Sequence, residues 1–253
     1  MSLRENRPLA RHRWSGDRPT ALRGLVGLPA VICALLFLAG AASAQTVAVA
    51  PGVQVTKRTY SAPSGEQPFF GFVARDATQQ AADENFVKAM IEATGTREKA
   101  CEEASNRGWR ALGKGNAAEA AQRFNQAFLL APEQSRVYHG FAAIAQIRFR
   151  DADFAEELYR IARQQPNPLK TLNADYGRAL LIAKRPREAQ PVLEQAVKDT
   201  PDFGDAWVNL AWARLRNGDP AAACAAADEA ARQRPSRNAG TELIALRGSA
   251  VCK

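Results

Sequence analysis

Few residues of this chain are of the types that carry out catalysis or bind metal ions. The sequence of 253 residues holds two histidines, of which only His139 lies beyond residue 44. Zinc sites built on histidine and Ser-His-Asp catalysis therefore lack their parts. Adjacent carboxylates such as Glu102 and Glu103 point to different sides of a helix, so they are poor acid–base partners. We expect no catalytic residue, no metal site, no cofactor and no enzyme, and we expect His139 to face solvent or a partner.

One glycine-containing stretch has the form of a nucleotide-binding motif. GKGNAA (Gly113 to Ala118) matches the dinucleotide fingerprint G-x-G-x-x-A. That motif works only after a strand and within a parallel sheet. A helix is predicted before it here, so we do not expect nucleotide binding.

Three cysteines lie beyond residue 44: Cys101, Cys224 and Cys252. In an oxidising compartment an odd number allows one bridge and leaves one thiol. The neighbours of Cys224 are all alanine, which is typical of a buried, small apolar residue. A Cys224–Cys252 disulfide that holds the C-terminal helix in place is the competing hypothesis.

Residues 1–44 have the form of a secretory signal peptide. Six arginines precede an apolar run, and the segment ends in the small residues Ala42-Ser43-Ala44. We expect cleavage after Ala44 and export to the periplasm, with no membrane span in the mature chain. The alternative is an uncleaved N-terminal membrane anchor. The segment has two acidic residues and so holds +4 of the formal charge of +8, while the other 28 basic and 24 acidic residues give +4. We therefore expect no nucleic-acid partner.

Residues 45–75 carry few helix signals. Val47 and Val49 alternate with polar or small residues, as do Val53 and Val55, which predicts one short strand. A single strand has no partner, so we interpret the segment as a flexible leader. PFFGF (residues 68–72) is too apolar for a free linker and is expected to dock on the first helices.

The elements beyond the leader are predicted to be helical and repeated. Four prolines follow one another at separations of 34, 35 and 34 residues: Pro132, Pro166, Pro201 and Pro235. Alanine stands five residues before three of them (Ala127, Ala196, Ala230) and twelve before (Ala120, Ala189, Ala223), and a small residue stands 24 before (Gly108, Gly177, Ala211). Small residues let helices approach closely, and a proline ends the second helix.

A two-helix unit of 34 residues with these small positions resembles the tetratricopeptide repeat, here over about residues 101–237. The resemblance implies an all-α fold, a right-handed α-solenoid of tetratricopeptide helix pairs. A solenoid needs capping helices at its ends. We expect these at residues 76–100, where Phe86 and Met90 mark an apolar face, and at residues 238–253.

The copies fit the pattern unequally. In the copy Gly204–Arg237, Asp219 is expected to cap a second helix that begins at Pro220. In the second copy, Glu157 stands where the small residue of the second helix belongs. There we expect a longer first helix and a shorter second one.

The family binds peptides or partner proteins in a concave groove lined by five positions of each first helix. Carried onto this chain, the groove residues are Trp109, Leu112, His139, Gln146, Phe149, Arg150, Arg178, Leu181, Asp205, Val208, Trp212 and Arg216. Arginine and aromatic side chains often dominate binding energy, and an acidic or carboxylate-ended peptide would suit them. The alternative is that Trp109 and Trp212 are packing residues. The clamp asparagine of chaperone-binding members is replaced by Trp109, Gln146, Arg178 and Trp212.

A narrower resemblance covers about residues 78–147. QQAADENFVKAM, RGWRALGKGNAAEAAQRFNQAFLLAP and YHGFAAI together look like a group of exported bacterial tetratricopeptide proteins of no assigned activity. Two functions therefore stand side by side. The first is an exported, non-enzymatic module that binds an extended peptide or partner protein in its groove. The second is a structural accessory subunit of a cell-envelope assembly machine, held through its leader and convex face.

Overall fold

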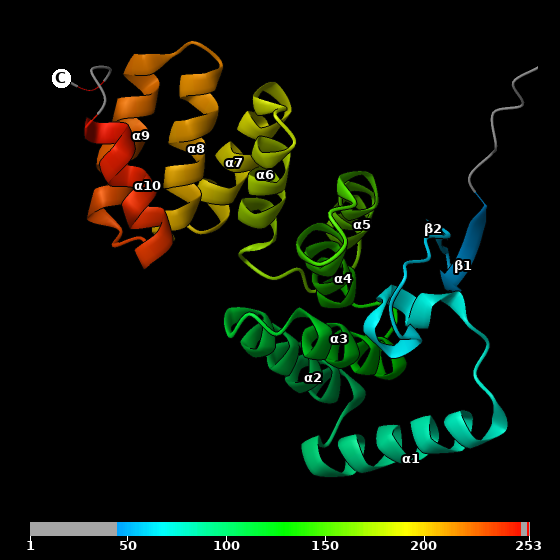
Figure 1. Cartoon of the computed structure of the whole chain (residues 1–253). Coiled ribbons are helices and arrows are strands. Elements are labelled where there is room, and N and C mark those ends of the chain that lie inside the picture. Colours follow the sequence, from blue (N-terminus) through cyan, green and yellow to red (C-terminus); the bar gives the residue numbers. More distant parts are fainter. Residues whose placement is uncertain (1–44, 249–251, 253) are drawn as a thin grey trace, which may run out of the picture. The chain divides into compact units, whose positions relative to one another are not determined.

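The computed structural model describes residues 45–248 and 252, all within one compact unit, Ser43–Lys253. The predicted signal peptide lies outside the described residues. These residues contain ten α-helices and one two-stranded sheet (Figure 1). Across the described ranges, no helix has the length and apolar character needed to cross a bilayer.

Eight of the helices form four consecutive pairs. They are α2 (Arg97–Gly113) with α3 (Ala117–Leu130), α4 (Ser135–Ile147) with α5 (Ala152–Gln164), α6 (Leu172–Ile182) with α7 (Pro186–Asp199), and α8 (Gly204–Arg216) with α9 (Pro220–Arg232). Each helix packs most extensively on the other member of its pair. The predicted all-α solenoid of helix pairs is thus confirmed. Helix α1 (Ala77–Thr94) packs on α2 and α3, and α10 (Arg237–Gly248) packs on α8 and α9.

The small residues of the repeat lie where helices meet. Ala120 and Ala127 are fully buried. A Cβ atom added to Gly108 of α2 would lie 2.6 Å from the ring of Phe124, and one added to Gly140 of α4 would lie 2.3 Å from the same ring. Phe124 is itself fully buried. The absence of two side chains therefore makes room for one aromatic ring at the junction of α2, α3 and α4.

The turn between the two helices of each pair has one residue in the left-handed backbone conformation. These residues are Gly115, Arg150, Lys184 and Gly218, with φ of +78°, +55°, +60° and +86°. They recur at the repeat spacing. After the last of these turns, the side chain of Asp219 accepts a hydrogen bond from the Ala222 amide and caps α9, as predicted.

The expectation for the second repeat is wrong. Helices α4 and α5 have 13 residues each, so the first helix is not the longer one. Because α5 begins at Ala152, Ala155 takes the buried small position, and it is 1% exposed. Glu157 instead accepts a hydrogen bond from the Thr56 amide of the leader, at 2.6 Å.

The leader has regular structure. Strand β1 (Thr46–Ala50) pairs antiparallel with β2 (Val53–Thr56), and the chain reverses at Gly52, whose φ is +72°. The expectation of a single strand without a partner, and with it the flexible leader, is therefore wrong, because the second half of the valine pattern supplies the partner strand. Two short 3-10 turns follow, Ser64–Glu66 and Pro68–Phe72.

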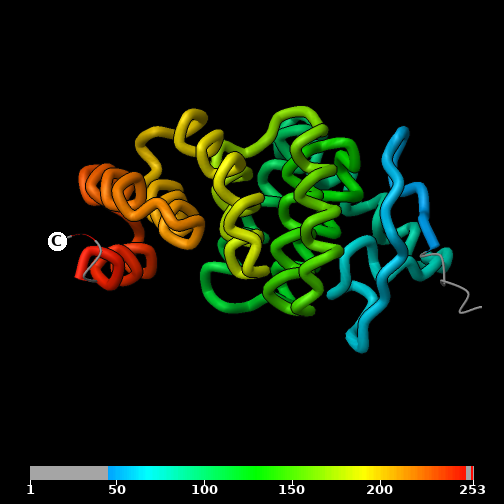
Figure 2. The backbone as a smooth tube through the Cα atoms, turned by 90° about the horizontal axis from the view of Figure 1, so that it is seen from above, coloured from blue at the N-terminus to red at the C-terminus, as the bar shows by residue number. Residues whose placement is uncertain are grey.

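The leader docks on the first two repeats (Figure 2). Phe69 is 5% exposed, and its ring contacts Phe128 of α3 and Phe141 of α4 at centroid distances of 5.3 and 4.6 Å. The docking expected of the PFFGF segment is thus found. Phe69, Phe70 and Phe72 have φ between +54° and +58°, a conformation that side chains disfavour and that surrounding contacts must impose.

The C-terminal helix is tied to α9. Cys224 and Cys252 form a disulfide bridge with their Cα atoms 5.5 Å apart, as hypothesised. Cys101 is a buried free thiol, and its burial raises its pKa to about 12.

A thiol with so high a pKa forms almost no thiolate at pH 8, and the thiolate is the reactive species. We expect iodoacetamide to leave Cys101 unmodified in the native protein and to modify it after denaturation. Peptide mass mapping without reduction is the measurement, and it should recover Cys224 and Cys252 as one linked peptide. Rapid native modification of Cys101 would contradict its burial.

Candidate functional site

Two adjoining pockets lie along the first helices of the repeats. A pocket of about 570 Å³ lies between α4, α5 and α6, and one of about 300 Å³ lies between α6, α8 and α10. Ile182, at the end of α6, lines both pockets and is 62% exposed. We call the two pockets together the groove. This exposed isoleucine places an apolar side chain where the two pockets meet.

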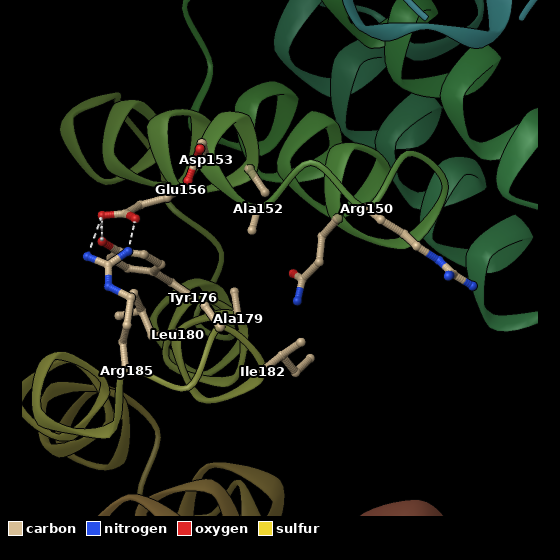
Figure 3. Close-up of a pocket in the computed structure, with 12 residues that line it drawn as sticks. Arg150, Ala152, Asp153, Glu156, Tyr176, Ala179, Leu180, Ile182 and Arg185 are labelled. Carbon is tan, nitrogen blue, oxygen red and sulfur yellow. Dashed lines mark hydrogen bonds and ion pairs between the residues drawn. The ribbon is translucent and has the colours of Figure 1, made fainter. Parts of the chain in front are cut away.

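The first pocket combines an apolar floor with an ion-pair cluster. Leu180 of α6 and Ala183, which directly follows this helix, provide apolar lining for the pocket. Glu156 of α5 binds Arg185 and lies 3.5 Å from the hydroxyl of Tyr176, which donates to it (Figure 3). Burial, and then the charge of Glu156, raise the pKa of Tyr176. The phenol therefore stays protonated and can donate a hydrogen bond.

The opposite side of this pocket is basic. Arg150 lines the pocket from the turn after α4, and its side chain extends away from the Glu156–Arg185 cluster (Figure 3). Arg185 already binds two carboxylates, those of Glu156 and Glu188, and these hydrogen bonds raise its pKa. Of the described residues that line the first pocket, Arg150 is thus the exposed cation.

The second pocket is built around Arg178. Its guanidinium donates to both carboxylate oxygens of Glu242 in α10, at 2.8 and 3.2 Å, and to Oδ1 of Asn209 at 3.1 Å. The hydrogen bond to Glu242 is the main reason that the pKa of Arg178 is raised. The two side chains are 44% and 34% exposed. Because solvent screens such a pair, it contributes only about 0.2–1 kcal/mol.

The rest of the second pocket is aromatic and basic. The guanidinium of Arg216 lies 5.6 Å from the ring centroid of Trp212 and donates to the carbonyl oxygen of Leu181 at 2.9 Å. Trp212 and Arg216 leave the same helix, α8, and face α6 across the pocket. Four arginines and three carboxylates line the whole groove: Arg150, Arg178, Arg185, Arg216, Asp153, Glu156 and Glu242.

Six of the twelve groove residues predicted from the sequence line these pockets: Gln146, Arg150, Arg178, Leu181, Trp212 and Arg216. Two others are fully buried. Val208 is 0% exposed. His139 is also 0% exposed, and its Nε2 lies 2.9 Å from an oxygen of Asp175. The expectation that His139 faces solvent or a partner is therefore wrong.

The other four predicted residues make intramolecular contacts. Trp109 packs edge-on against Phe124 and His139, which is the alternative role considered for it, and Leu112 packs on the core. Phe149 stacks on Tyr60 of the leader, with centroids 3.9 Å apart. Asp205 accepts hydrogen bonds from the amide and hydroxyl of Ser236, each at 2.7 Å, just before α10.

Sequence reasoning missed the acidic residues of the groove. Glu242 lies beyond the last proline, where no complete repeat was expected, yet it follows Val208 by 34 residues. Continuing the repeat spacing into the capping helix would have assigned it to the groove. Glu156 and Tyr176 carried no comparable signal, because they reach the first pocket from positions that the family pattern does not assign to the groove.

Comparisons with known proteins agree with the helix-pair architecture. Residues 174–238 match the family model described as tetratricopeptide repeat. The chain matches none of the curated proteins with which it was compared.

Solved structures of the same architecture are similar to this chain. The structure from a functional characterisation of Pseudomonas aeruginosa pilF shares 24% sequence identity, over 60% of this chain and 69% of that chain, with a TM-score of 0.53. YrrB, described as a TPR protein with an unusual peptide-binding site, shares 17% identity over 65% and 83% of the two chains, with a TM-score of 0.47. PilW, described as a widely conserved type IV pilus biogenesis factor, shares 14% over 70% and 89%, with a TM-score of 0.48. The first of these likenesses shows the fold.

Proposed function

The chain carries tetratricopeptide repeats, and on that premise we propose that it is an exported, non-enzymatic module that binds an extended peptide segment of a partner protein in the groove. The observation that carries the proposal is the continuity of the two pockets through the exposed side chain of Ile182. Export, to the periplasm, is proposed on the form of residues 1–44.

The groove has the features of a peptide site. Peptide-recognition surfaces bind an extended segment through pockets for its side chains and through polar or charged contacts. Ile182 and Trp212 offer apolar surface, while Arg150 and Arg178 offer charge at separate places along the groove. An extended segment can present side chains to both pockets in turn, which a compact small molecule cannot do.

The structure gives less support to attachment of a partner through the leader. The alternative function needs the aromatic segment around Phe69 to be available to another protein. That ring is 5% exposed and packs against Phe128 and Phe141. Phe69 therefore packs on the chain's own repeats, and the groove is the better-supported binding surface.

The proposal predicts peptide binding that depends on the groove. A displayed library of random peptides is selected on the full chain, and the affinities of enriched peptides are measured by fluorescence polarisation. We expect Trp212→Ala and Arg178→Glu each to weaken binding on the order of tenfold or more, because anchor residues dominate such interfaces.

Two matched variants control for folding. Trp207 lies on α8 and donates to the Pro201 carbonyl oxygen, and Arg232 pairs with Glu229 on α9. Neither lines the groove. Trp207→Ala and Arg232→Glu should leave the affinity within about twofold of wild type, as contacts outside an interface do. Selection of no peptide, or equal binding by the groove variants, would rule the proposal out.

A further inference from the structure

We infer that the second pocket recognises a carboxylate of the bound peptide, and that Glu242 of α10 is an intramolecular stand-in for that carboxylate, which the peptide must displace from Arg178. The inference rests on the proposed function and adds to it the chemical class of the ligand and a built-in competitor.

The geometry of Arg178 already fits a carboxylate. Its guanidinium forms the two-pronged pair with Glu242 through Nη1 and Nη2, the arrangement by which arginine selects carboxylates in a plane. Asn209 accepts a further hydrogen bond from Nη1 and so fixes the orientation of the fork. Among the described residues that line the second pocket, Glu242 is the one carboxylate, and it pairs with Arg178.

The helix that presents Glu242 is anchored independently of Arg178. One end of α10 is held by Asp205 of α8 through Ser236. The other end is followed by the Cys224–Cys252 bridge to α9. Glu242 can therefore release Arg178 by a change of its own side-chain rotamer while α10 stays in place.

Replacing Glu242 by a peptide carboxylate at Arg178 costs little free energy, because the Arg178–Glu242 pair is partly solvated. Both side chains keep more than a third of their surface exposed to solvent, so water screens their attraction. A peptide carboxylate would form the same fork with Arg178 and, beside it, would place a neighbouring apolar side chain on Ile182 or Trp212. An acidic segment with interspersed apolar residues is thus the ligand that fits.

The test uses a labelled octapeptide in which aspartate and leucine alternate, and the same peptide with asparagine in place of aspartate. We expect Glu242→Gln to raise the affinity of the full chain for the acidic octapeptide about 1.4- to 5-fold, the factor that corresponds to removing one solvated ion pair. The affinity for the asparagine peptide should not rise. Glu229→Gln is the matched control, because Glu229 pairs with Arg232 outside the groove, and it should change neither affinity.

A double variant separates competition from a structural effect. In an Arg178→Gln background, the gain caused by Glu242→Gln should vanish, because the competitor then has nothing to block. A gain that persists there, or an unchanged or lower affinity of Glu242→Gln alone, would overturn the inference. If library-selected peptides bind in the groove but the acidic octapeptide does not bind, the carboxylate inference fails while the proposed function stands. If no peptide of any kind binds, the proposed function itself fails.

Discussion

Phe124→Ala is expected to lower the free energy of unfolding by about 3–5 kcal/mol, the usual cost of removing a fully buried phenylalanine side chain. The ring is 0% exposed and joins three helices, because Gly108 of α2 and Gly140 of α4 both abut it. The ring of Trp109 also packs edge-on against the ring of Phe124, with the ring centroids 5.3 Å apart. Denaturant unfolding followed by circular dichroism measures the loss. Phe128→Ala, at a half-buried position on the same helix, should cost clearly less.

At the same site, we expect the effect of Gly140→Ala on the free energy of unfolding to change sign when the Phe124 ring is removed. In the wild type, Gly140→Ala places a Cβ atom 2.3 Å from the Phe124 ring, so we expect it to cost about 1–3 kcal/mol through overpacking. In the Phe124→Ala background the ring is gone. Alanine then partly fills the space and also favours the helix over glycine by roughly 0.5–1 kcal/mol, so Gly140→Ala should stabilise. Equal destabilisation in both backgrounds would show that the ring is not what Gly140 accommodates.

Asn125→Ala is the second change with a large expected effect, because the side chain of Asn125 forms hydrogen bonds with the backbone of the leader. The side chain is 0% exposed. Its Nδ2 donates to the carbonyl oxygens of Gly65 and Gln67 at 2.9 and 2.8 Å, and its Oδ1 accepts from the Phe70 amide at 3.1 Å. Alanine leaves all three backbone groups without this partner, which we expect to cost about 2–4 kcal/mol.

Release of the leader should follow from this loss. The backbone at Phe69 and Phe72 has positive φ, so undocking relieves strain as well as exposing the segment. We expect trypsin to cleave after Lys57 and Arg58 on the order of tenfold faster in Asn125→Ala than in wild type, because cleavage follows the population of the opened segment.

The matched control for the leader is Asn173→Ala. Asn173 donates to Asp199 on the exposed surface of the third repeat, away from the leader. It should leave the cleavage rate at the leader unchanged. If Asn125→Ala also leaves that rate unchanged, contacts other than this side chain hold the leader in place.

The repeated fold could be predicted from the sequence because its determinants are local and periodic. Prolines at separations of 34 and 35 residues and alanines such as Ala120 and Ala127 mark helix ends and close helix contacts. The leader could not be predicted as well, since its structure depends on non-local partners. Nothing near Thr56 indicates that its amide binds Glu157, which lies 101 residues away.

The candidate site was predictable only where the side chains at the repeat positions reach a pocket. Arg178 and Trp212, which are 34 residues apart, line the second pocket as the family pattern implies. Asp205 occupies an equally regular position, but Ser236 binds it. Whether a residue at such a position faces solvent or forms an intramolecular contact depends on segments outside the repeats, and the spacing does not specify these contacts.

The most direct test of the groove places a photo-crosslinking residue at position 182 of the full chain in cells and maps each adduct by mass spectrometry. Ile182 lines both pockets, whereas Ile244, 74% exposed on α10, lines neither and is the control position. We predict a dominant adduct from position 182 whose captured peptide is extended and rich in acidic residues. It should be lost with Arg178→Glu and absent from position 244. No adduct at 182, or one that survives Arg178→Glu, would contradict the account.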